Sequence, residues 1–270
     1  MLGTALLLYF VTLTHQETAH YDAAYYEEYN HFDKSSSSSV KVNDTENYPG
    51  YLIEGDIRVL RDPEIAEAGD YNAVKEDKKW PRGIIPYEIS PNFTKIQTEM
   101  IEKVMQQFHD KTCVRFIPKS KTDVNYIKIV CDSGCWSFAG MYGGAQPVSL
   151  GCLLEKMNKG RGKRTILHEL MHAIGFWHEI SRPDRDQYIE VLWDNVEKGR
   201  EHNFEKKSID HVNQICPYDV CSRLHYPATW FAKVQQTIVS DYAIMYIVPC
   251  TIQYVLNMFN GHTAHAASRS

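Results

Sequence analysis

Three histidines and a glutamate at fixed spacing are the residues of this sequence best suited to chemistry. They stand in an H-E-x-x-H-x-x-G-x-x-H pattern formed by His168, Glu169, His172, Gly175 and His178. Residues four apart lie on one face of a helix, so His168 and His172 can direct their imidazoles at one point. Gly175 can adopt a left-handed backbone without steric cost, which lets the chain turn and bring His178 to the same point.

Three neutral imidazoles that converge in this way are typical of a catalytic zinc site, because they leave a fourth coordination position open. Glu169 follows the first histidine and is placed to take a proton from a water activated by the metal. A chance match on an amphipathic helix is the alternative reading, but the extended pattern fixes five positions and favours a zinc hydrolase. The sequence therefore predicts one Zn²⁺ per chain.

Composition places these residues in an ordinary globular chain. The 270 residues allow one large domain or a domain with appendages, and 43% of them are hydrophobic and 23% charged. A net charge of -5 gives no basic surface for nucleic acid, so no nucleic-acid partner is expected. Seven cysteines suit an oxidising compartment, and the odd number leaves at least one without a partner in the chain.

The N-terminus predicts secretion. Residues 2–13 form an apolar run that is too short to span a bilayer and is followed by polar residues. A buried strand or helix is the alternative, but acidic, tyrosine-rich sequence comes soon afterwards. We therefore expect a signal peptide over residues 1–18, a secreted, extracellular protein, and no transmembrane segment, since the apolar stretch at residues 242–259 is interrupted by Pro249 and polar residues.

The segments between the N-terminus and the histidines alternate between loop, strand and helix patterns. Residues 20–50 are polar and are expected to be flexible, with Asn43 and Asn92 in acceptor triplets for N-glycosylation. Helical spacing of apolar residues starts at Ile96, and residues 156–164 predict a basic turn before the zinc helix. Strand patterns, with a loop-rich edge region after the last of them, occupy residues 51–59, 79–89, 114–117, 126–130 and 131–152. The fold class is therefore α+β.

From about residue 51 to about residue 233 the sequence resembles the astacin family of zinc metalloendopeptidases. The motifs that carry the resemblance stand in the family's order: Trp80-Pro81, Ile85-Pro86-Tyr87, Thr112 to Phe116, Gly134 to Ser137, Gly144 to Leu150, and His178 to Asp186. The resemblance implies a metzincin-like, two-lobed catalytic domain over residues 72–238. It implies a mixed sheet with the active-site helix, a mostly irregular lower lobe, and a protein or peptide as substrate.

The resemblance also gives roles to matching residues. It implies that zinc is bound by His168, His172 and His178. Glu169 would be the general base and acid, and Tyr226 would ligate zinc at rest and then swing to stabilise the oxyanion.

Further roles follow from the same resemblance. Leu224 stands where the family's turn has methionine, a swap of similar volume that usually costs under about 1.5 kcal/mol. Glu179 would hold the new N-terminus of the mature enzyme in a buried ion pair. Cys135 would pair with Cys152.

A short segment ahead of the domain resembles the family's F-x-G-D switch, with Ile53 at the aromatic position. Asp56 would then cap zinc in a zymogen, and a carboxylate oxygen is a normal zinc ligand. The expected propeptide covers residues 19–71, and an activating protease would cut near residues 71–73. After residue 238 the family's closing segment is not recognisable, so residues 239–270 are expected to form an atypical tail.

Two functions from different classes follow from these observations. The first is a secreted zinc-dependent endopeptidase made as a zymogen. The second is a zinc-binding but catalytically inactive secreted homologue that acts as a binding protein, which Leu224 and the tail suggest. A purely structural zinc site is a third reading, less favoured because it needs a closed fourth ligand.

Overall fold

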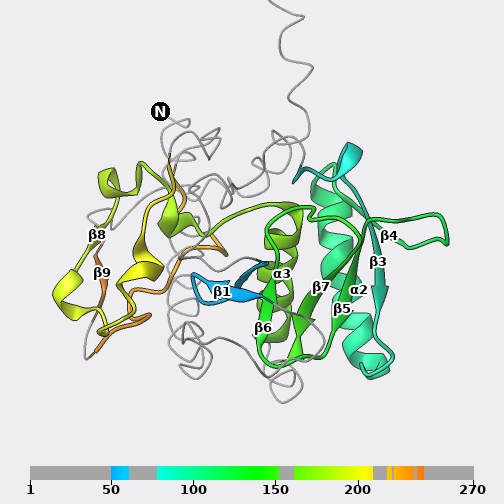
Figure 1. Ribbon diagram of the computed structural model, residues 1–270, viewed down its shortest axis with the longest axis horizontal. Coiled ribbons are helices and arrows are strands. Elements are labelled where there is room, and N and C mark those ends of the chain that lie inside the picture. Colours follow the sequence, from blue (N-terminus) through cyan, green and yellow to red (C-terminus); the bar gives the residue numbers. More distant parts are fainter. Residues whose placement is uncertain are drawn as a thin grey trace, which may run out of the picture.

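The computed structural model describes residues 50–60, 78–151, 161–208, 218–220, 222–233 and 236–239. Within these ranges, one half of the molecule holds a mixed sheet with helices α2 and α3, and the other half holds short 3-10 helices and a two-stranded sheet (Figure 1). The strands β1 and β2, blue in Figure 1, lie between the two halves. This arrangement confirms the predicted two-lobed α+β fold.

Seven described strands form the main sheet in the order β1-β2-β6-β7-β5-β3-β4. Their bounds are Tyr51–Ile53 (β1), Ile57–Val59 (β2), Ile84–Ile89 (β3), Arg115–Pro118 (β4), Tyr126–Val130 (β5), Cys135–Ser137 (β6) and Ala145–Leu150 (β7). The pairs β1–β2 and β6–β7 are antiparallel. The pairs β2–β6, β5–β7, β3–β5 and β3–β4 are parallel, so the sheet is mixed as predicted.

Helix α2 (Lys95–Lys111) begins at a capping box, in which Thr94 and Gln97 bond each other's backbone amides. These bonds satisfy amides that the first helical turn leaves without partners. The predicted apolar face is buried from Ile101 to Phe108. The prediction that this face begins at Ile96 is wrong, because the Ile96 side chain is 73% exposed.

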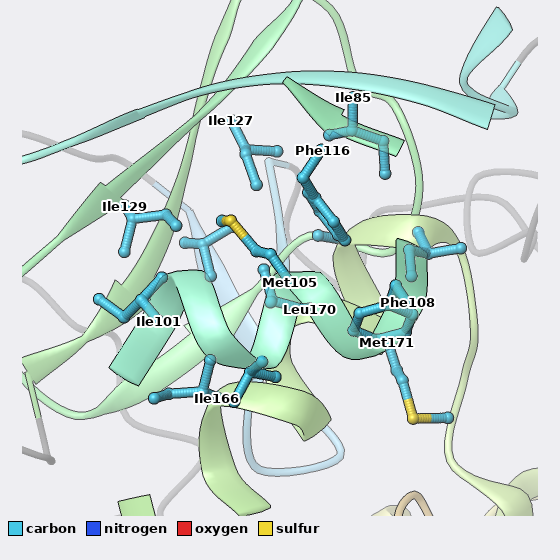
Figure 2. Packing of buried hydrophobic residues seen from close by; sticks show 14 of the residues in the cluster. Ile85, Ile101, Met105, Phe108, Phe116, Ile127, Ile129, Ile166, Leu170 and Met171 are labelled. Atoms are coloured by element: carbon cyan, nitrogen blue, oxygen red, sulfur yellow. The ribbon is translucent and has the colours of Figure 1, made fainter. Parts of the chain in front are cut away.

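Helix α3 (Arg161–Ile174) carries the first two histidines and packs against α2 and the sheet. The predicted basic turn is therefore wrong at its end, because residues 161–164 already belong to the helix. Figure 2 shows α2, α3 and the strands directing apolar side chains into one core. The members labelled there are Ile85, Ile101, Met105, Phe108, Phe116, Ile127, Ile129, Ile166, Leu170 and Met171. Each such side chain contributes about 1.5–3 kcal/mol by leaving water, so this core fixes the position of α3.

The other half of the molecule is mostly irregular, as predicted. Its elements are η6 (Glu179–Ser181), η7 (Arg185–Gln187), β8 (Glu190–Val191), η8 (Trp193–Asn195), η9 (Glu201–Phe204) and β9 (Ile238–Val239). A second cluster of buried apolar side chains stabilises it, with Ile180, Phe204, Tyr226 and Phe231 among its members. The described helices of this half are short 3-10 helices, so the packing of side chains and buried polar contacts stabilise its loops.

Several sequence predictions fall outside the described residues. These are the signal peptide, most of the propeptide with its cleavage site, Asn43, Cys152 and the tail beyond residue 239. In the described ranges, no helix combines the length and the apolar character that a membrane crossing requires.

Candidate zinc site

The end of α3 brings the third histidine back toward the first two. The Gly175 amide donates to the His172 carbonyl (2.8 Å), and the Phe176 amide donates to the Met171 carbonyl (3.1 Å). This pair of hydrogen bonds requires a positive φ at the residue after the helix, and Gly175 has a φ of 130°. The chain then continues extended through His178, whose φ is -62° and ψ is 140°. The turn predicted at Gly175 is therefore present.

The three imidazoles meet at their Nε2 atoms. His168 Nε2 lies 3.1 Å from that of His172 and 3.4 Å from that of His178. A tetrahedral ion with bonds of about 2.05 Å to nitrogen separates its ligand atoms by roughly 3.3 Å. The spacing of the three rings is therefore the spacing that zinc requires.

The other ring nitrogens show why a cation fits between these rings. His168 Nδ1 lies 2.7 Å from the Arg223 carbonyl, and His172 Nδ1 lies 2.7 Å from the Phe176 carbonyl. A carbonyl only accepts, so both Nδ1 atoms carry a proton, and in its neutral form each ring presents a lone pair at Nε2. Two lone pairs 3.1 Å apart repel unless a cation or a shared proton lies between them. The donor set thus fits a single zinc ion.

Asp56 completes the cluster from the loop between β1 and β2. Its carboxylate oxygens lie 3.0 Å from His168 Nε2, 3.6 Å from His172 Nε2 and 3.2 Å from His178 Nε2. One ligand atom from each of the four residues lies within 4.8 Å of the others. Burial would raise the pKa of Asp56, but His178 and His168 outweigh burial and hold that pKa well below its usual range.

Glu169 lies in the same buried space. Its side chain is 1% exposed, and none of the described residues hydrogen-bonds its Oε2. Burial, reinforced by the negative charge of Asp56, raises the pKa of this carboxyl well above its usual range. A buried carboxyl oxygen without a protein partner is available to a group that is not part of the protein.

Tyr226 is buried beside the cluster, with its ring centroid 4.8 Å from that of His178. Its hydroxyl donates to the main-chain carbonyl of Glu54 at 2.8 Å. The next residue back, His225, lies 2.7 Å from the Tyr226 carbonyl through Nδ1 and 2.9 Å from the Tyr218 hydroxyl through Nε2. The role predicted for Tyr226 at zinc stays a prediction, because its hydroxyl is engaged by a peptide carbonyl here.

Glu179 contacts groups of the irregular half. Its Oε1 accepts from the Asp219 amide at 2.9 Å and from Arg182 Nη1 at 3.2 Å. Burial raises its pKa to about 7, although Arg182 acts in the opposite direction. The N-terminal segment expected to reach Glu179 lies outside the described residues, so that ion pair also stays a prediction.

The structure also describes Leu224 and Cys135, for which the family resemblance implied a turn position and a disulfide. Leu224 is 2% exposed and belongs to the core that contains Leu170 and Met171 of the zinc helix. Its carbonyl accepts from the Glu179 amide at 2.8 Å, next to the third histidine. Cys135 is disulfide-bonded, and its predicted partner lies outside the described residues.

Glu54 is a site residue that the sequence patterns did not reveal. Its Oε2 lies 2.9 Å from His178 Nδ1, and its Oε1 lies 2.5 Å from Lys207 Nζ. Burial would raise the pKa of Glu54, but Lys207 and His178 outweigh it and lower that pKa to about 2. These partners are more than a hundred positions away in the chain, and no spacing rule connects them.

Known proteins resemble this chain in sequence and fold. The model of the peptidase family described as Astacin matches residues 72–246, which extends past the expected domain end at residue 238. Zinc metalloproteinase nas-13 of Caenorhabditis elegans is 43% identical over 166 residues, which cover 60% of this chain and 35% of that protein. Zinc metalloproteinase nas-4 of the same organism is 37% identical over 209 residues, covering 74% of this chain and 64% of that protein. The chain therefore spans between about a third and two thirds of the length of these two relatives.

A solved structure extends the likeness to the fold. High choriolytic enzyme 1, a hatching enzyme zinc-protease from the medaka fish Oryzias latipes, superposes with a TM-score of 0.59 at 30% identity. The match covers 69% of this chain and 98% of that enzyme. Since both the family model and a nearly complete catalytic structure match, this chain belongs to the astacin family of zinc metalloproteinases.

Proposed function

We propose that this chain is a secreted, zinc-dependent endopeptidase made as a zymogen, in which the β1–β2 hairpin (Tyr51–Val59) is the inhibitory segment. The observation that carries the proposal is the position of the Asp56 carboxylate, within 3.0–3.6 Å of the three converging Nε2 atoms. A carboxylate is a normal fourth ligand of zinc, so the hairpin fills the position that catalysis needs open.

The hairpin also uses the sheet edge that an extended peptide would need. Strand β2 pairs in parallel with β6, with Ile57 opposite Ser137. The Ser137 amide donates to the Asp56 carbonyl at 3.0 Å. Peptides commonly bind proteins by adding a strand to a free sheet edge. With the hairpin in place, a substrate strand has neither this edge nor the zinc position.

The residues around the cluster suit peptide hydrolysis once the hairpin has left. Bound zinc would supply a Lewis acid that polarises a peptide carbonyl and acidifies a water molecule. Glu169 would accept the proton of the attacking water at its carboxylate and return it to the leaving amine. Tyr226 already donates to a peptide carbonyl, that of Glu54, at 2.8 Å. The same hydroxyl would donate to the oxygen of the scissile carbonyl as negative charge develops there.

Activation and secretion complete the proposal. Cleavage near residues 71–73 would release the hairpin and create an N-terminal ammonium, for which the buried carboxylate of Glu179 is the expected partner. The apolar leader supports export, and an oxidising compartment suits the disulfide at Cys135. Asn92 is exposed, as an acceptor of N-linked glycan must be.

Leu224 and the atypical tail are the two observations that suggested a catalytically inactive homologue, and the structure bears on the first of them. Leu224 is buried in the core that contains the zinc helix, and its volume is similar to that of methionine, so this difference gives little reason to expect inactivity. The atypical tail, which was the other observation, lies outside the described residues.

The test compares the zinc-loaded full chain before and after limited proteolysis, with a denatured protein as substrate. We expect cleavage only after processing, and a loss of roughly 10²–10⁴-fold in kcat for Glu169→Gln with one zinc per chain retained. The unprocessed Asp56→Asn variant should show activity that the unprocessed wild type lacks. Full activity in processed Glu169→Gln would refute the mechanism, and zinc binding without any cleavage would support the inactive homologue.

A further inference from the structure

The turn of the β1–β2 hairpin contains a residue in an unfavourable conformation. Glu54 has a φ of 54° and Gly55 a φ of 98°. Hairpin turns with two positive φ values normally use Asn, Asp or Gly at the first position, because a longer side chain is disfavoured there. A glutamate persists in such a conformation only where the surrounding structure compensates for it, and such residues cluster at functional sites.

The compensation comes from the carboxylate of Glu54. This residue is 4% exposed, and its two oxygens contact Lys207 Nζ at 2.5 Å and His178 Nδ1 at 2.9 Å. Lys207 Nζ also lies 4.1 Å from the centroid of the Trp177 ring, and its side chain is 16% exposed. The carboxylate thus contacts an ammonium group and a ring N–H, and the Trp177 ring lies against that ammonium group. The contact with His178 is a charge-assisted hydrogen bond, which is about twice as strong as a neutral one, and the contact with Lys207 is a buried ion pair.

These contacts differ in kind from those of Asp56. Asp56 approaches the Nε2 side of the histidines, where the metal binds, whereas Glu54 approaches the Nδ1 side of His178. Its partners are protein groups only. The Glu54 contacts therefore hold the hairpin whether or not zinc is bound.

We propose that Lys207, Trp177 and the Nδ1 side of His178 form a carboxylate-binding subsite next to the zinc cluster. Glu54 fills it while the β1–β2 hairpin is in place, and an acidic side chain of a peptide substrate fills it after the hairpin has left. The second half rests on the proposed function. The subsite lies close to the zinc position, because Glu54 is only two residues from Asp56, whose carboxylate lies at the catalytic position. A side chain near the scissile bond of a substrate can therefore reach it.

The first arm of the test measures how often the hairpin leaves its site in the full-length protein. Arg58 lies in β2 and is 1% exposed, so trypsin can cut after it only when the hairpin has opened. The rate of this cut, followed by mass spectrometry, should rise roughly tenfold or more in Glu54→Gln and in Lys207→Gln. The increase should persist when a chelator has removed zinc.

The matched control is Lys206→Gln, which changes the neighbouring lysine and removes an ion pair with Asp186 outside the subsite. It should leave the rate unchanged. If Glu54 and Lys207 act on each other, the double variant opens no faster than Glu54→Gln alone, whereas general destabilisation would make the effects add. Rates in Lys207→Gln within about twofold of the wild type, or fully additive effects, would overturn the subsite.

The second arm uses the processed protein and peptide pairs that differ only by Glu or Gln at one position near the scissile bond. At the position that reaches the subsite, the wild type should prefer Glu in kcat/KM, and Lys207→Gln should reduce that preference roughly tenfold. Lys206→Gln should keep it. Equal preference in the wild type and Lys207→Gln would overturn the substrate half. If no peptide is cut, the proposed function fails, while the trypsin arm still decides whether Glu54 occupies the subsite.

Discussion

Arg185 connects the loop after the third histidine to the rest of the irregular half, and replacing it tests how that half is held together. Its side chain is 3% exposed, and Nη1 donates to the Ile180 carbonyl at 2.9 Å and to the Phe204 carbonyl. Phe204 in turn packs edge-to-face against Tyr226, with ring centroids 5.7 Å apart. Arg185→Met keeps an unbranched side chain of similar length but leaves both carbonyls without this donor.

The expected cost follows from these contacts. A hydrogen bond to a charged group contributes about 1.5–3 kcal/mol, so losing two buried ones costs about 3–6 kcal/mol. Methionine avoids burying a guanidinium, and this offsets part of the loss. The bond from Arg185 Nε to Asp186 adds little, because the Asp186 side chain is 56% exposed. We therefore expect Arg185→Met to lower the free energy of unfolding by about 2–4 kcal/mol.

Urea denaturation of the zinc-saturated full chain, followed by tryptophan fluorescence, measures this change. Lys103→Met is the control, because Lys103 is exposed on α2 and its replacement should alter the unfolding free energy by less than about 0.5 kcal/mol. A loss below about 1 kcal/mol in Arg185→Met would show that other contacts hold the two carbonyl groups and that the reasoning is wrong.

Three smaller changes can be measured in the same titration. Thr94→Ala removes the cap that Thr94 Oγ1 gives the Gln97 amide and should cost about 1 kcal/mol; an unchanged midpoint would contradict the capping box. Trp80→Phe leaves the buried Ala173 carbonyl without the indole donor at 2.8 Å and should cost about 1–3 kcal/mol; an unchanged unfolding free energy would contradict a stabilising role for this bond. Leu224→Met should change the unfolding free energy by less than about 1.5 kcal/mol, and a larger change would mean that the site is shaped specifically for leucine.

Local sequence rules predicted the elements whose form depends on near neighbours. The spacing of His168 and His172 requires a helix, and Gly175 is the residue that allows the turn after it. The apolar face of α2 was predicted to start at Ile96; it is buried from Ile101 to Phe108, whereas Ile96 is exposed. Periodicity reports an average face, whereas exposure in the first turn depends on whether another element covers that turn.

Some predictions that rested on the family resemblance are confirmed, and others stay predictions. The two-lobed fold, the mixed sheet and the single zinc ion are confirmed by family membership and the converging rings. Asp56 lies at the histidines, which supports its proposed role as a switch. The hydroxyl of Tyr226 donates to the Glu54 carbonyl of the hairpin, so its predicted role depends on removal of the hairpin. The carboxylate of Glu179 contacts Arg182 and Asp219, and its predicted ion pair stays a prediction.

The sequence by itself determined the metal, because three histidines on a helix and its glycine turn are close in the chain and obey helical geometry. It also determined the fold family, because many short motifs occur in one order. Only the tertiary structure decided that β2 lies on the edge of β6 and that Glu54 meets His178 and Lys207. Those contacts join segments separated by more than seventy residues, and such pairing depends on how the whole core packs rather than on any local pattern.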